Sequence, residues 1–134
     1  MSTARALLNR QKTVAAGVVT VMVLLGAVLY PSLPDQMAVH WSASGEADGM
    51  APKPIAVGAM PALVVFMSVL FAATDVSADD RVVGSVAMLL LLVVQIMVLS
   101  TNLGIDVPIV PVALAGAFVV VSLAVWFELR NPGT

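Results

Sequence analysis

Residues 30–53, YPSLPDQMAVHWSASGEADGMAPK, form a polar stretch interrupted by proline and glycine between two long apolar runs. The stretch holds the single histidine and the single tyrosine of the chain, and one of its two tryptophans. The runs on either side consist mainly of aliphatic and small side chains. We therefore expect specific recognition or chemistry to lie in this stretch, with the rest of the chain as its hydrophobic scaffold.

The composition is that of an integral membrane protein. Hydrophobic residues make up 60% of the chain and charged residues 10%, whereas a soluble domain carries about 25% charged residues. The sequence contains no cysteine, so it has no disulfide, thiolate nucleophile or cysteine-ligated metal site. A formal net charge of −2, without a basic cluster beyond the first dozen residues, argues against binding to nucleic acid.

Four apolar runs predict an all-α integral membrane protein with four transmembrane helices. Each run has about the 20 residues that a helix needs to cross the hydrocarbon core of a bilayer. Apolar segments of this length without alternation favour helices over the strands of a membrane barrel. The runs cover residues 13–30, 54–74, 82–103 and 108–127.

The first run follows a basic tail, as a signal peptide or a membrane anchor does. Its apolar part is longer than that of a signal peptide, and no small-residue cleavage site precedes Tyr30. We therefore expect an uncleaved first helix. Since no internal repeat is present, we predict a single membrane domain over residues 1–134, in which residues 82–127 supply two further helices.

The distribution of lysine and arginine predicts the orientation in the membrane. Only Lys53 lies in the loop 31–53 or in the third connection, and cytoplasmic segments carry an excess of basic residues. We therefore expect a multi-pass protein of the cell membrane with both termini in the cytoplasm and loop 31–53 outside. The basic residues of the two tails and the middle connection are Arg5, Arg10, Lys12, Arg81 and Arg130.

Every charged side chain lies in a tail, in a loop or at the end of a predicted span. Proton-coupled transporters and pumps place ionisable groups inside the membrane, so the pattern disfavours active transport. Gln95 is the one strongly polar side chain at mid-depth. We interpret it as a hydrogen-bonding contact between helices.

Within the loop, Met37, Val39 and Trp41 alternate with Ala38 and His40, which is the period of a short extended segment. Turn residues that include two glycines follow directly. These features predict a small hairpin-like cap over the helix bundle. We expect Met37, Val39 and Trp41 to pack toward the helices.

The loop also resembles the signature of a known family. The stretch LPDQMAVHWSASGEADGMAPK is similar to the amino-terminal membrane domain of SdpI-type immunity proteins, the domain of unknown function 1648 family. That signature has a Leu-Pro-x-x-(Ile/Met)-x-x-His-(Trp/Phe) pattern before a Gly-Glu/Lys segment. With its flanking helices the resemblance covers residues 14–70. The matching residues are Leu33, Pro34, Met37, His40, Trp41, Gly45, Glu46, Asp48, Gly49 and Lys53.

The resemblance implies a protein that protects against a secreted toxic peptide and acts as a receptor for it. Ala38 stands where the family usually has proline. The second family signature, which contains asparagine, glycine and arginine, has no counterpart between residues 82 and 134.

We expect the loop to bind a peptide or another membrane protein. Aromatic side chains would anchor such a partner, and the charged side chains would provide electrostatic complementarity. A histidine in the contact set would make binding depend on pH. The expected contact residues are His40, Trp41, Glu46, Asp48 and Lys53.

Two alternatives stay open. The first is a metal-dependent membrane enzyme that uses His40 with Glu46 and Asp48, and with Asp35 as a further ligand, because a catalytic zinc needs about three protein ligands. No known catalytic spacing such as HExxH is present, so we expect no catalytic residues, no metal and no cofactor. The second is a small accessory or structural subunit, whose partners besides the lipid bilayer would be other membrane proteins or further copies of the chain.

Overall fold

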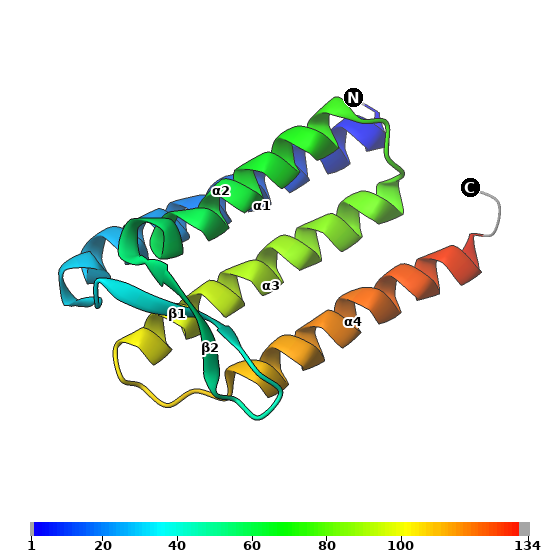
Figure 1. Ribbon diagram of the computed structural model, residues 1–134. Coiled ribbons are helices and arrows are strands. Elements are labelled where there is room, and N and C mark those ends of the chain that lie inside the picture. The colour runs from blue at the N-terminus through cyan, green and yellow to red at the C-terminus, as the bar shows by residue number, and fades with distance from the viewer. Residues whose placement is uncertain (1, 132–134) are drawn as a thin grey trace.

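The computed structural model describes residues 2–131 and shows four long helices and one β-hairpin (Figure 1). All four helices are long and apolar enough to cross a membrane, which confirms the predicted fold class. The predicted single domain includes residues 1 and 132–134, which lie outside the described part of the chain. In order, the elements are α1 (Thr3–Leu29), the 3-10 turn η1 (Tyr30–Ser32), β1 (Gln36–Trp41), β2 (Ala47–Pro52), α2 (Lys53–Ala73), α3 (Ala78–Asn102) and α4 (Ile109–Arg130).

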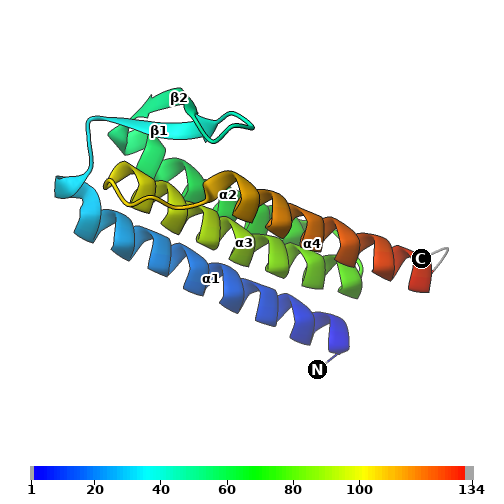
Figure 2. The same ribbon diagram turned by 90° about the horizontal axis from the view of Figure 1, so that it is seen from below.

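The helices form a three-helix unit with a fourth helix on one side. α1, α2 and α3 pack against one another, and α4 packs chiefly against α3, which lies between α4 and α1 (Figures 1 and 2). The start of α1, the end of α4 and the α2–α3 connection lie at one end of the molecule, which we call the terminal end. The hairpin and the α3–α4 connection lie at the other, which we call the hairpin end.

Helix starts follow local capping rules. α3 begins after Ser77, whose hydroxyl accepts a hydrogen bond of 3.1 Å from the backbone N–H of Asp80. Asp79 and Asp80 place negative charge in the first turn, where the helix dipole favours it. α1 begins at Thr3, about ten residues before its apolar run, after the N-cap Ser2. The charged tail of the sequence therefore continues the first membrane helix.

Two groups of buried side chains form the core. One lies between α1, α2 and α3, and the other lies beneath the hairpin, where α4 contributes its only buried residue, Ile109. Methionine occupies both groups, with Met22, Met37 and Met88 fully buried. Most residues of α4 are exposed and present an apolar face suited to lipid. The first group is Ala15, Val18, Met22, Val64 and Met88, and the second is Leu33, Met37, Ala56, Met97, Val98, Leu99 and Ile109.

Gln95 joins α3 to α2 at mid-depth, which confirms its interpretation as an interhelical contact. Its Nε2 donates to the backbone carbonyl of Val57 over 3.2 Å, and the residue is almost fully buried. In a regular helix that carbonyl would accept from the residue four positions later. That residue is Pro61, which has no N–H to donate. Gln95 thus satisfies the carbonyl that the proline leaves free.

The hairpin is antiparallel, with Met37 opposite Ala51 and Ala38 opposite Met50. As predicted, Met37 packs inward and Trp41 packs against the core beneath it. The prediction for Val39 is wrong, because its side chain is 39% exposed while Ala38 is buried. The pairing is irregular between Ala38 and His40, and such an irregularity breaks the strict alternation of sides.

Candidate functional site

The hairpin is attached to the helices by the side chain of Asn102, the last residue of α3. Its Oδ1 accepts from the backbone N–H of Ala38 over 2.8 Å, and its Nδ2 donates to the carbonyl of Ala38 over 2.9 Å. The same Nδ2 also donates to the carbonyl of Val98, one turn earlier in α3. The amide thus pairs with β1 as a neighbouring strand would, and it holds the hairpin in one position over the bundle.

The base of the hairpin is closed around Lys53. The backbone N–H of Lys53 donates to the carbonyl of Asp35 over 2.8 Å. Its Nζ donates to the carbonyl of Tyr30 over 3.0 Å and lies 4.5 Å from the centre of the Tyr30 ring. The Asp35 carboxylate lies 4.0 Å from the same Nζ. Lys53 therefore ties the end of α1 to the start of α2.

His40 and Asp48 face each other across the two strands. The Nδ1 of His40 lies 2.5 Å from Oδ1 of Asp48, and the two side chains are 75% and 47% exposed. An exposed pair of this kind adds little to stability. Its accessibility instead leaves both side chains free to meet a partner.

The turn between the strands carries Glu46. The backbone N–H of Ser42 donates to the carbonyl of Glu46 over 2.8 Å, and Gly45 adopts a positive φ of 89° that the turn requires. The side chain of Glu46 is exposed. Of the predicted contact residues, the structure brings His40 and Asp48 into contact, places Glu46 at the turn and Lys53 at the base, and leaves Trp41 half-buried.

A groove of about 510 Å³ lies between the hairpin turn and the start of α4. A second hollow of about 260 Å³ adjoins it, since Gly45, Asp106 and Ile109 line both. Most of the lining residues are apolar, and the polar ones are Ser44, Asp106 and the α3 residue Thr101. We call the two hollows together the hairpin groove.

One polar atom beside the hairpin groove has no partner. The Oγ1 of Thr101 is buried and makes no hydrogen bond with any described residue. A buried hydroxyl without a partner is unfavourable by about 1–3 kcal/mol.

The hairpin end is acidic. Asp35, Glu46, Asp48 and Asp106 belong to it, and Lys53 is its only lysine or arginine among residues 2–131. Within the same residues no group of three or more histidine, cysteine, aspartate and glutamate side chains is arranged to hold a metal ion. The residue set of the metalloenzyme alternative is therefore not assembled, and the acidic surface favours a partner with basic groups.

Three residues of this end were not predicted from the sequence. Thr101 and Asn102 lie at the end of the apolar run 82–103, and Asp106 lies in the short third connection, where nothing in the sequence singles them out. The only signal was an amide side chain at the hairpin end of a membrane span. Its pairing with Ala38, 64 positions away in the sequence, is a tertiary contact.

These features define a multi-pass helical membrane protein whose first loop is a structured hairpin fixed to the bundle. Residues 17–65 match the family model described as Domain of unknown function (DUF1648). The match covers the second half of α1, the hairpin and the larger part of α2, and it confirms the resemblance to this domain family. No curated protein and no solved structure matches the chain.

Proposed function

We propose that the protein is a membrane receptor that binds a peptide or protein partner through its hairpin end, on the outer side of the cell membrane. The observation that carries this proposal is the hairpin groove, which combines mostly apolar lining residues with the polar residues Ser44, Asp106 and Thr101. Recognition sites commonly have this mixed lining. The hairpin that forms one wall is held by Asn102, so the groove is present before a partner arrives.

The charge of the hairpin end indicates the kind of partner. Asp106 lies in the hairpin groove, and the exposed Asp48 and Glu46 lie on the hairpin beside it. A peptide with an apolar segment and basic side chains would match the apolar lining of the groove and the acidic side chains around it. The resemblance to SdpI-type proteins suggests a secreted peptide, against which the receptor would protect the cell.

Protection of growing cells tests this function. Cells that carry the intact gene, or no gene, are challenged with material secreted by the source organism and its relatives. We expect the intact protein to protect, and Asp106→Asn and Ser44→Trp to lose protection, because the first removes the charge and the second fills the groove. Asp75→Asn, in the α2–α3 connection at the terminal end, is the matched control and should protect fully.

Membrane abundance is measured for every variant, so that loss of protein is not mistaken for loss of binding. No protection by the intact protein at normal abundance would overturn the immunity function and favour the accessory-subunit alternative. Equal loss in Asp106→Asn and Asp75→Asn would remove the groove from the proposal. His40→Ala tests separately whether the exposed face of the hairpin takes part.

The proposal requires that the hairpin end lies outside the cell. The basic residues of the terminal end support this orientation. Since the chain has no cysteine, single cysteines report their own side of the membrane. We expect Ser44→Cys in intact cells to react with an impermeant maleimide and Ser77→Cys to react only after lysis. The reverse pattern would contradict the orientation.

A further inference from the structure

A buried arginine at the terminal end has no acidic partner among residues 2–131. Arg81 lies in the first turns of α3 and is 8% exposed. Its guanidinium donates to the carbonyls of Phe71 and Thr74, over 3.0 and 3.4 Å, and to Oε1 of the buried Gln11 over 3.3 Å. These acceptors are all neutral. The positive charge is therefore held by dipoles and is not neutralised.

The nearby acids do not neutralise Arg81. Asp79 accepts a hydrogen bond of 2.7 Å from the side chain of Asn131, which joins α3 to the end of α4. Asp80 is exposed, and among residues 2–131 no carboxylate lies within ion-pair distance of the guanidinium. A buried cation of this kind is costly unless an anion reaches it.

Arg81 lines a groove of about 230 Å³ between α1 and α3, which we call the arginine groove. Arg10 of α1 lines the same groove, so two arginine residues border one hollow. Apart from Gln11 and Ser85, the other lining residues are apolar, and Val14, Val86 and Leu89 lie along the membrane-spanning parts of the two helices. The groove thus combines cationic residues from the ends of the helices with a hydrocarbon-like wall.

We propose that the arginine groove binds one anionic phospholipid. Its phosphate accepts hydrogen bonds from Arg10 and from Arg81, since guanidinium groups bind phosphate with charge-assisted bonds. One acyl chain lies along Val14, Val86 and Leu89. A free phosphate would leave these apolar walls uncovered, and the lipid bilayer offers the missing chain directly. The site does not depend on the receptor function of the hairpin end.

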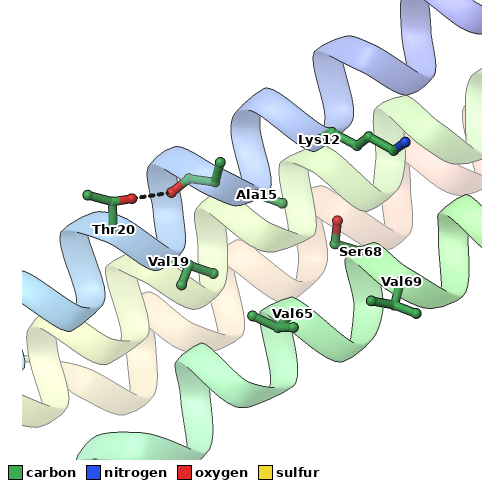
Figure 3. A pocket seen from close by; sticks show the side chains of 8 residues that line it. Lys12, Ala15, Val19, Thr20, Val65, Ser68 and Val69 are labelled. Atoms are coloured by element: carbon green, nitrogen blue, oxygen red, sulfur yellow. Dashed lines mark hydrogen bonds between the residues drawn. The ribbon is translucent and has the colours of Figure 1, made fainter.

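A neighbouring groove of about 330 Å³ between α1 and α2 provides the comparison. It has a single cationic residue, Lys12, and Ser68 is its polar residue on α2 (Figure 3). Lys12 lies at one end of this groove, and Val19 and Thr20 lie at the other. It contains no buried charge, because Lys12 is exposed. We therefore assign the lipid to the arginine groove and use Lys12 as the control.

Native mass spectrometry of the whole protein tests the assignment. The protein is released from mixed micelles that contain phosphatidylcholine and phosphatidylglycerol in equal amounts. We expect one retained phosphatidylglycerol on the intact protein and on Lys12→Gln. Arg10→Gln should lower that occupancy about fivefold relative to phosphatidylcholine, which is the effect of one basic residue at a membrane surface. Arg10 is exposed, so this variant should fold.

The outcomes distinguish a specific lipid-binding site from general attraction of anionic lipid to basic helix ends. Equal losses in Arg10→Gln and Lys12→Gln, or no preference for phosphatidylglycerol in the intact protein, would overturn the proposal. Displacement of the lipid by excess inorganic phosphate would also overturn it, because the acyl chain would then contribute nothing. Arg81→Lys keeps the charge but not the planar guanidinium, and we expect it to retain less lipid than Lys12→Gln.

Discussion

The two ends of the helix bundle are closed by side chains of the same helix, α3, but with different chemistry. At the hairpin end the neutral amide of Asn102 pairs with the backbone of Ala38. At the terminal end the charged guanidinium of Arg81 donates to the carbonyls of Phe71 and Thr74. Each contact satisfies backbone groups that secondary structure leaves unpaired, as a membrane environment requires.

The two contacts differ in the net charge that remains once the backbone groups are hydrogen-bonded. An amide leaves no net charge, so the receptor function that we propose for the hairpin end rests on exposed carboxylates and on the hairpin groove. A guanidinium leaves a buried positive charge, on which the anionic lipid that we propose for the terminal end depends.

The largest effect should come from removing the charged contact. Arg81→Met leaves the carbonyl of Phe71 and the Oε1 of Gln11 without donors, and we expect a loss of about 3 kcal/mol in the free energy of unfolding. Unfolding by SDS titration in mixed micelles measures it. Arg5→Met at the exposed start of α1 is the control and should change stability by less than about 0.5 kcal/mol. Equal effects would show that Arg81 contributes only surface charge.

Removing the Asn102 contact should lower the free energy of unfolding by a smaller amount. Asn102→Ala leaves the N–H and the carbonyl of Ala38 unpaired, and we expect a loss of about 2 kcal/mol. Faster hydrogen exchange at the amide of Ala38 should accompany it, since the hairpin loses its attachment. Asn102→Asp keeps the acceptor for that amide but places a carboxylate oxygen against the carbonyls of Ala38 and Val98, so its effect should be at least as large. Unchanged exchange in Asn102→Ala would mean that burial of Met37 alone holds the hairpin.

A third contact of α3, between the two ends, should have a smaller effect that depends on its proline partner. Gln95→Leu removes the donor to the carbonyl of Val57, and we expect a loss of about 0.6 kcal/mol, as for other polar contacts between membrane helices. In a Pro61→Ala background the helix supplies its own N–H to this carbonyl, so the same change should cost almost nothing. A double-mutant cycle on SDS unfolding measures the coupling. Additive effects would show that Gln95 does not substitute for the missing N–H.

The smallest effect should have the opposite sign. Thr101→Val removes the buried hydroxyl without a partner at little change in volume, and we expect stability to stay constant or rise by up to about 1 kcal/mol. Thr20→Val is the matched control, since the Thr20 hydroxyl donates to the carbonyl of Ala16 over 2.7 Å. A loss of stability in Thr101→Val would show that this hydroxyl makes a stabilising contact after all.

Much of the architecture could be predicted from the sequence. The spans, the hairpin-like loop, the inward side of Met37 and the role of Gln95 as an interhelical contact follow from local hydrophobicity and turn residues, and the structure confirms them. The prediction for Val39 failed because the irregular pairing next to Ala38 has no signature in the apolar pattern. The contact role of the predicted residues stays a prediction.

The candidate sites were harder to predict because they depend on packing. Arg81 entered the sequence argument only as a basic residue that reports orientation, and nothing local shows that it is buried. Lys53 was expected to contact a partner, but its Nζ already bonds the carbonyl of Tyr30. The burial of Arg81 and the hydrogen bond of Lys53 depend on how the ends of different helices lie relative to one another.

The sequence by itself determined that this is a four-span membrane protein with one structured polar loop. Span length and turn composition are local properties, and the bilayer allows few other solutions for apolar segments of that length. The tertiary structure decided which side chains complete the unpaired backbone at each end, where the grooves lie, and that α4 packs chiefly on α3. Those features join residues as distant as Ala38 and Asn102, or Gln11 and Arg81, and such contacts exist only once the helices pack.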